Sequence, residues 1–239
     1  MICRRPYFVH GRTPVGCGQC IPCRVNRRRV WTVRQVLESF LHEANCFVTL
    51  TYSPENLPAD GSVSPAHLRN YLKRLRKELS KLDIRVRFFG VGEYGDQTNR
   101  PHYHLSLFGC GLEMATVIDN TWPYGFTQTG EFNYSTAQYV CGYTVKKLTN
   151  KADQRLDGRH PEFARMSNRP GIGADAMGVI ADAVLTDAGL DEFAKTGDVP
   201  AAIRMQGKKV PLGRYLRSKL RDDVGVSEKQ THPVHRDHQ

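Results

Sequence analysis

The chain has 239 residues, with 34 Lys and Arg against 24 Asp and Glu, which gives a formal net charge of +10 at pH 7. This length allows one well-packed catalytic domain with a small additional module, and the basic excess favours a polyanionic partner, nucleic acid before acidic lipid. No apolar run reaches the length of a membrane span and no signal-peptide region opens the chain, so we expect a cytosolic protein without membrane contact.

Seven cysteines, an odd number, argue against a disulfide framework in that compartment and favour thiolate ligands. Four of them lie near the start of the chain: Cys3, Cys17, Cys20 and Cys23. Two consecutive Cys-x2-Cys spacings let thiolates on a tight turn converge on one tetrahedral ion, and we expect structural zinc. Cys3 is the expected fourth ligand, with His10 as the alternative. An iron–sulfur cluster and free thiols are the rival interpretations.

A basic helix is expected after the cysteines, from residue 24 to about residue 44. Apolar residues recur in it at helical spacing: Val30, Val33, Leu37, Phe40 and Leu41. Three arginines, Arg27, Arg28 and Arg29, crowd its first turns, where cations oppose the helix macrodipole. Contact with DNA phosphates would explain their position; a charged face that serves only solubility is the alternative.

A β-branched and aromatic run at 46–52 predicts the first strand, which Ser53 and Pro54 end. Ser64 and Pro65 then begin a helix with one apolar face. That face carries Leu68, Leu72, Leu75 and Leu79. We expect this helix to cover the back of the sheet.

Two further strands, 84–94 and 101–108, are joined by a short polar loop and should form an antiparallel hairpin. Side chains alternate along a strand, so His102 and His104 should project from one face while Tyr103 and its apolar neighbours enter the core.

The hairpin also predicts a metal site, because Glu93 comes close to His102 and His104 when the strands pair. A carboxylate as the third ligand favours Mg²⁺ or Mn²⁺ over a three-histidine zinc site. Asp96 in the connecting loop is the alternative third ligand.

Weaker patterns follow, with a short helix expected at 114–122 and a strand at 126–132. Ser135 is a candidate N-cap for a helix that runs to about Leu148. The order of strand, helix, hairpin, helix, strand and helix is typical of an α+β domain in which helices pack on an antiparallel sheet.

Two tyrosines, Tyr139 and Tyr143, stand one turn apart on one face of that last helix. Lys146 and Lys147 follow one turn further along. Phenols and ammonium groups would therefore line one stripe of the helix.

The rest of the chain gives weaker signals. A basic, turn-rich segment at 165–173 precedes an expected helix at 175–188, a hairpin within 201–212 and a short basic helix at 214–221. We expect an accessory DNA-binding or packing region. The polar tail from Asp223 is expected to be disordered.

The His-x-His strand followed by Tyr-x-x-x-Tyr-x-x-Lys resembles the HUH endonucleases, and among them the rolling-circle replication initiators of small single-stranded DNA phages of the microvirus or gokushovirus type. The run Phe-x-Thr-Leu-Thr-Tyr at 47–52 matches the first motif of that family, although Tyr103 stands where the family usually has a bulky aliphatic residue. The resemblance implies a five-stranded antiparallel sheet of RRM-like or ferredoxin-like topology.

The same resemblance implies a site-specific endonuclease that nicks a viral origin through a 5′-phosphotyrosine and so initiates and terminates rolling-circle replication. Tyr139 and Tyr143 would be the nucleophiles, and Lys146 would stabilise the charge that develops. The expected DNA contacts are Arg27, Arg28, Arg29, Arg100 and Lys147. The expected partners are single-stranded DNA and the host helicase and polymerase, in the cytoplasm of a bacterial host.

We therefore divide the chain into a Cys-rich zinc-binding segment with a basic helix (1–44), a nicking domain (45–150), a basic accessory region (151–222) and a disordered tail (223–239). A sequence-specific, zinc-containing DNA-binding protein without catalysis remains an alternative, but it gives no reason for histidines, a carboxylate and tyrosines to converge. A plasmid relaxase or a transposase is the other alternative. Relaxases usually carry a third histidine and such transposases a single catalytic tyrosine, so the paired tyrosines favour the replication initiator.

Overall fold

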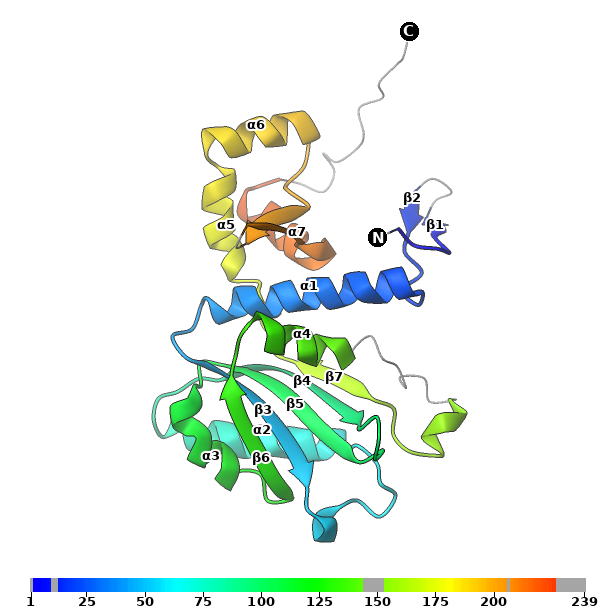
Figure 1. Cartoon of the computed structure of the whole chain (residues 1–239). Coiled ribbons are helices and arrows are strands. Elements are labelled where there is room, and N and C mark those ends of the chain that lie inside the picture. Colours follow the sequence, from blue (N-terminus) through cyan, green and yellow to red (C-terminus); the bar gives the residue numbers. More distant parts are fainter. Residues whose placement is uncertain (1, 10–12, 144–152, 206, 227–239) are drawn as a thin grey trace.

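The computed structural model of the chain describes residues 2–9, 13–143, 153–205 and 207–226 (Figure 1). Its centre is a five-stranded sheet with the order β6-β3-β5-β4-β7, in which every pairing is antiparallel. The strands are β3 (Asn45–Tyr52), β4 (Arg87–Tyr94), β5 (Pro101–Phe108), β6 (Gly125–Glu131) and β7 (Phe163–Met166). The predicted α+β class and antiparallel sheet are confirmed.

One face of the sheet is covered by α2 (Pro65–Ser80) and by α3 (Ala115–Asn120), which follows a 3₁₀ turn. The N-cap of α2 is Ser64, whose hydroxyl accepts the backbone N–H of His67, as its position before Pro65 predicts. The apolar face of α2 is buried against the sheet, together with Tyr103, Leu105 and Leu107 of β5: Leu68, Leu72, Leu75 and Leu79. From β3 to β6 the chain follows the ferredoxin-like βαββαβ order.

The opposite face is covered by α1 (Ile21–Ser39) and α4 (Tyr134–Tyr143). Helix α1 ends earlier than the apolar spacing predicted, so Phe40 and Leu41 lie outside it and are exposed rather than packed. The N-cap of α4 also differs from the prediction. The side chain of Asn133, not that of Ser135, accepts the first free N–H, from Thr136.

Buried polar contacts hold α1 on the sheet. Gln35 accepts a hydrogen bond from the Ser106 hydroxyl at 2.6 Å and donates to the Cys141 sulfur of α4 at 2.8 Å. Glu38, 1 % exposed, pairs with Arg87 of β4 and accepts the backbone N–H of Gly173 at 2.6 Å. Because each of these polar side chains has partners, α1 can lie buried with polar residues facing the sheet.

A C-terminal module packs on the other side of α1 (Figure 1). It consists of α5 (Ala176–Val184), α6 (Asp187–Thr196), β8 (Ala202–Met205), β9 (Lys208–Pro211) and α7 (Gly213–Asp223). Leu216 and Leu220 of α7 share a core with Val33 and Leu37 of α1. The predicted hairpin and basic helix are confirmed, whereas the single helix predicted at 175–188 is two helices.

At the other end of α1, β1 (Tyr7–Val9) and β2 (Thr13–Val15) form a small hairpin. Short 3₁₀ turns complete the structure at Pro54–Asn56, Leu112–Met114 and Gln154–Leu156. Among the described residues, no helix combines the length and the apolar character that crossing a membrane requires. The predicted disordered tail lies outside the described residues from residue 227 onward.

Candidate active site

Strands β4 and β5 bring one carboxylate and two imidazoles together at the open end of the α1 face. Glu93 pairs directly with His102 across the hairpin, and Val91 pairs with His104. The Oε1 atom of Glu93 lies 2.7 Å from Nε2 of His102 and 3.2 Å from Nε2 of His104. Glu93 and His104 are only 2 % and 4 % exposed, whereas His102 is half-buried. The three ligand atoms therefore meet at one point that solvent reaches past His102.

The other ring nitrogens of the two histidines have partners that suit metal binding. Nδ1 of His102 lies 3.1 Å from the carbonyl oxygen of Arg100, and Nδ1 of His104 lies 3.0 Å from the hydroxyl of Thr49 on β3. A histidine that donates its Nδ1–H to an oxygen presents Nε2 as an acceptor, which is the usual arrangement around a metal ion. The donor set thus fits a divalent cation.

Burial and charge act differently on the two imidazoles. Burial favours the neutral form of His102, but the hydrogen bond to Glu93 and the charge of that carboxylate together outweigh it and raise the pKa of His102. At His104 burial is the larger effect and lowers the pKa, with the neighbouring His102 acting in the same direction. A neutral His104 is the form that binds a metal ion.

The structure brings Glu93, His102 and His104 together, and this group could hold a metal ion. The alternative ligand, Asp96, is exposed in the hairpin turn and is not part of this group.

Helix α4 places Tyr139 beside this group. Its ring lies 5.1 Å from the His104 ring and 6.0 Å from the Phe47 ring, edge-on to both, and is 48 % exposed. Tyr143 closes α4 one turn later. Lys146 and Lys147 lie outside the described residues.

The four N-terminal cysteines form a second possible metal site. The sulfur atoms of Cys3, Cys17, Cys20 and Cys23 all lie within 4.8 Å of one another, and those of Cys3 and Cys20 are 3.8 Å apart. Four thiolates around a zinc ion, each about 2.3 Å from it, lie about 3.8 Å from each other. The geometry therefore fits a tetrahedral ion, while the alternative ligand His10 lies outside the described residues.

Backbone N–H groups also favour thiolates in this cluster. Hydrogen bonds from the backbone of Arg4 and of Cys23 lower the pKa of Cys20 to about 6. A thiolate is the form of cysteine that ligates a metal. The backbone around the cluster is thus arranged for bound cations, whatever their identity.

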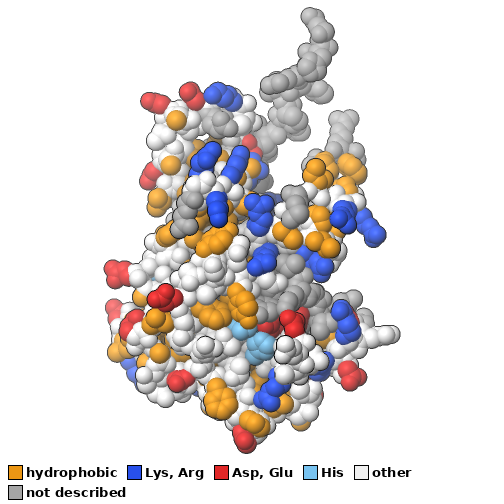
Figure 2. Space-filling view, viewed as in Figure 1, with side chains coloured by type: hydrophobic (Ala, Val, Ile, Leu, Met, Phe, Trp, Pro, Cys, Tyr) orange, Lys and Arg blue, Asp and Glu red, His pale blue; other side chains and the backbone are white. Residues whose placement is uncertain are grey.

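The arginines predicted to contact DNA occupy different environments. Arg28 donates from Nε to the carbonyl oxygen of Gln138 at 3.1 Å and so links α1 to α4. Arg100 donates to the carbonyl oxygen of Tyr52 at 2.9 Å, and Arg29 is exposed. Figure 2 shows histidine side chains reaching the surface beside acidic ones, with Lys and Arg side chains gathered above them over the N-terminal part of α1.

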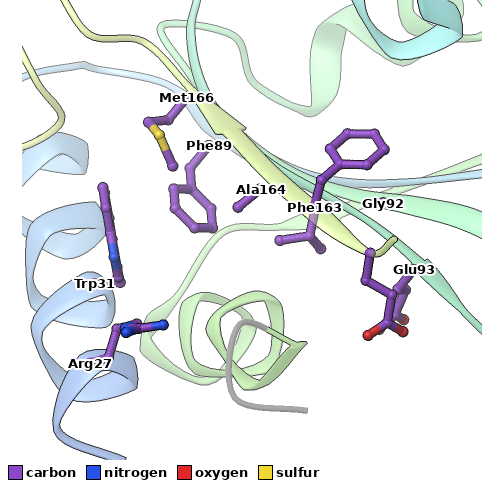
Figure 3. Close-up of a pocket in the computed structure, with 10 residues that line it drawn as sticks. Arg27, Trp31, Phe89, Gly92, Glu93, Phe163, Ala164 and Met166 are labelled. Atoms are coloured by element: carbon purple, nitrogen blue, oxygen red, sulfur yellow. The ribbon is translucent and has the colours of Figure 1, made fainter. Parts of the chain in front are cut away.

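A cavity of about 180 Å³ adjoins the Glu93 group (Figure 3). Arg27 and Trp31 of α1 form one wall, and Glu93, Glu162 and residues of β4 and β7 form the others. Sequence reasoning did not identify Thr49, Trp31 or Glu162 as site residues. Only Thr49 carried a usable signal, because strand alternation places it on one face with Phe47 and Thr51.

Comparison with known proteins gives a consistent family assignment. The family model for replication-associated protein ORF2 matches residues 45–148. Replication-associated protein ORF2 of Spiroplasma virus 4 is 34% identical over 188 residues, which cover 70% of this chain and 57% of that protein. Replication-associated protein VP4 of Bdellovibrio phage phiMH2K is 33% identical over 165 residues, covering 61% and 52%. For replication-associated protein ORF4 of Chlamydia phage 1 the values are 26% over 160 residues, 59% and 40%.

The chain thus spans about half the length of the curated relatives it matches. No solved structure matches it. The sheet strands β3 to β6, both histidines, Glu93 and Tyr139 all lie inside the matched range 45–148.

Proposed function

We propose, from the premise that this chain belongs to the replication-associated protein ORF2 family, that it nicks and rejoins single-stranded DNA at a phage replication origin through a phosphotyrosine. The observation that carries the proposal is the convergence of Glu93, His102 and His104 beside the ring of Tyr139. A protein that only bound DNA would have no use for buried ligands next to an exposed phenol.

The buried ligands define where the scissile phosphate must lie. A Mg²⁺ or Mn²⁺ ion held by Glu93, His102 and His104 would polarise the phosphate and stabilise charge on the leaving oxygen. Thr49 and the Arg100 carbonyl orient the two imidazoles through their Nδ1 atoms. The phosphate is thereby held within reach of Tyr139.

The chemical step exchanges one phosphoester for another. The phenol oxygen of a tyrosine attacks phosphorus and loses its proton, while the bond from phosphorus to the 3′ oxygen breaks and that oxygen gains a proton. The protein retains the 5′ phosphate as a tyrosyl ester, so a later 3′ hydroxyl can attack it and close the strand. Two tyrosines, Tyr139 and Tyr143, allow one to hold a 5′ end while the other cuts again.

Charge supports DNA as the substrate. The net charge of +10 and the arginines of the first turns of α1 favour a phosphate backbone near the site. We infer that Arg27, Arg29 and Arg100 contact this backbone, and that Lys146 and Lys147 contribute from the segment after α4. Single-stranded origin DNA, the host helicase and polymerase, and the bacterial cytoplasm are the partners and location we propose.

The test is a cleavage assay on a labelled pool of single-stranded candidate origin sequences with Mn²⁺ or Mg²⁺, analysed on a denaturing gel. We expect a metal-dependent, SDS-resistant protein–DNA adduct. Tyr139→Phe and Tyr143→Phe should each leave the fold intact, and the double variant should form no adduct. Cleavage by a folded double variant would point to another nucleophile, and tight binding without any adduct would favour the non-catalytic DNA-binding protein.

A further inference from the structure

The cavity beside Glu93 has the size and lining of a site for a single ring system. Its volume of about 180 Å³ is below the roughly 300–1,000 Å³ of pockets for drug-sized ligands. Val91, Ala164 and Met166 give it an apolar floor on the sheet, and Trp31 faces them from α1 (Figure 3). The Phe163 ring points to the other side of the strand, toward Tyr103 at 6.3 Å, and so leaves the cavity clear.

The Trp31 ring is held in place by its neighbours. The Arg34 guanidinium lies 4.0 Å from its centroid, and the Phe89 ring packs against it at 5.1 Å. A fixed indole wall costs little entropy on binding and offers a stacking surface for a nucleobase. Single-stranded DNA bound at Glu93 would place such a base next to it.

Polar groups in the cavity wall would discriminate among bases. The Glu162 carboxylate accepts the Tyr94 N–H at 3.3 Å and has lone pairs for a further donor. Cytosine and adenine carry an exocyclic amino group that can donate to such an acceptor, whereas thymine presents a carbonyl oxygen there. The Arg27 guanidinium, on the opposite wall, can meet the adjoining phosphate.

The position of Tyr139 indicates which nucleotide enters. Its ring approaches the metal ligands from the β3 side, next to Phe47, whereas the cavity opens on the β4 and β7 side. In phosphoryl transfer the attacking and leaving oxygens lie roughly in line across phosphorus. The nucleotide that carries the leaving 3′ oxygen is therefore directed toward the cavity.

We propose that the cavity between Trp31 and β7 binds the base of the nucleotide that carries the leaving 3′ oxygen, and that Glu162 selects a base with an exocyclic amino group. This inference rests on the proposed function and names the first determinant of its cleavage site.

Binding without cleavage tests it. The chain has two tryptophans, and Trp122 is 2 % exposed on the other face of the sheet, so quenching of fluorescence by DNA reports on Trp31. We would titrate the full chain in EDTA with oligodeoxycytidylate, oligothymidylate and an abasic oligomer of equal length. Oligodeoxycytidylate should quench emission and bind roughly fivefold or more tightly than oligothymidylate, and the abasic oligomer should bind without quenching.

Two variants connect this result to the cavity. Ala164→Phe fills the floor and should remove the quenching and weaken oligodeoxycytidylate binding roughly tenfold, while Ala201→Phe, at an exposed position of the C-terminal module, should change neither. Glu162→Gln keeps the shape and should abolish the preference for cytosine over thymine. Unchanged quenching in Ala164→Phe, or an unchanged preference in Glu162→Gln, would overturn the inference.

The cleavage assay separates this failure from failure of the proposed function. Adduct formation together with unchanged quenching in Ala164→Phe would remove the base site and keep the nicking activity. Cavity-dependent quenching without any adduct would keep the base site and remove the activity.

Discussion

Thr49 shows how a single hydroxyl can fix the geometry of the candidate metal site. It contacts Nδ1 of His104 at 3.0 Å from the neighbouring strand, so it decides which nitrogen of His104 faces Glu93. His102 receives the same help from a backbone carbonyl, which a side-chain substitution cannot remove. The orientation of His104 is therefore the more easily disturbed of the two.

We predict that Thr49→Val weakens Mn²⁺ binding by roughly 10–100-fold, the usual effect of removing an outer hydrogen bond to a metal-bound histidine. Valine has nearly the shape of threonine and favours strands, so the fold should persist. Isothermal titration with Mn²⁺ measures the effect. Thr51→Val is the matched control, because the Thr51 hydroxyl donates to the Phe126 carbonyl rather than to a histidine. Equal affinities in both variants would contradict the assigned role of Thr49.

At this scale the sequence predicts what is local. The meeting of Glu93 with His102 and His104 follows from a short hairpin and strand alternation, and the structure brings the three together as expected. Thr49 could not be assigned to His104 because the pairing of β3 with β5 depends on the whole sheet. Whether the three residues bind metal stays a prediction.

Helix α1 owes its place to buried polar side chains rather than to its apolar stripe alone. Glu38 is the main example, because its carboxylate joins α1 both to Arg87 of β4 and to the backbone of Gly173. Removing one partner from a buried ion pair leaves the other charge poorly solvated.

We expect Glu38→Gln to lower the free energy of unfolding by about 3 kcal/mol, as is common for broken buried pairs. Urea denaturation followed by circular dichroism measures it. Glu43→Gln, at an exposed position just beyond the helix, should stay within about 0.5 kcal/mol of the parent. Equal free energies of unfolding in the two variants would show that α1 is held by its apolar contacts.

The loop before β8 carries a second ion cluster, in which Asp198 accepts hydrogen bonds from Arg221 at 2.6 and 2.7 Å and pairs with Arg217. The Arg221 hydrogen bond is the largest of the effects that lower the pKa of Asp198. Since the folded pKa lies below the unfolded value of about 3.9, the carboxylate stabilises the fold above that pH. This stability is lost as the pH falls through the folded pKa.

Asp198→Asn should therefore cost about 2 kcal/mol at neutral pH, and the difference from the parent should shrink below about pH 4. Thermal unfolding across a pH series measures both. Asp222→Asn serves as the control, because Asp222 is exposed and pairs only at the surface with Lys219. A difference that persists unchanged into acid would show that the charge of Asp198 is not the cause.

Elements with strong periodicity were predictable, and short or context-dependent ones were not. The apolar face of α2 and the alternation in β5 identified both elements. Strand β7 has four residues inside a basic, turn-rich segment, and only pairing with β4 makes it a strand. Phe40 and Leu41 fit the helical spacing of α1, but spacing does not mark where a helix ends.

The whole molecule is organised in layers around α1. The sheet with α2 and α3 lies on one side, the C-terminal module on the other, and the cysteine cluster at the N-terminal end (Figure 1). The division of the chain at residues 44, 150 and 222 stays a prediction. The small N-terminal hairpin buries too little to be stable alone, which is why a metal would matter there.

We expect the purified chain to carry about one equivalent of zinc, and Cys20→Ser to lose it. Elemental analysis by mass spectrometry measures the content. Cys110→Ala removes a buried thiol outside the cluster and should retain the metal. Finding no zinc in the parent would remove the zinc assignment.

The central place of α1 also bears on how the protein is made. The helix leaves the ribosome before any of its packing partners, and its contacts with α7 need the chain as far as Leu220. Synthesis proceeds at about 5–20 residues per second, so α1 waits on the order of ten seconds for its last partners. Its apolar sides are exposed during that interval, which makes nascent chains substrates for chaperones that bind early.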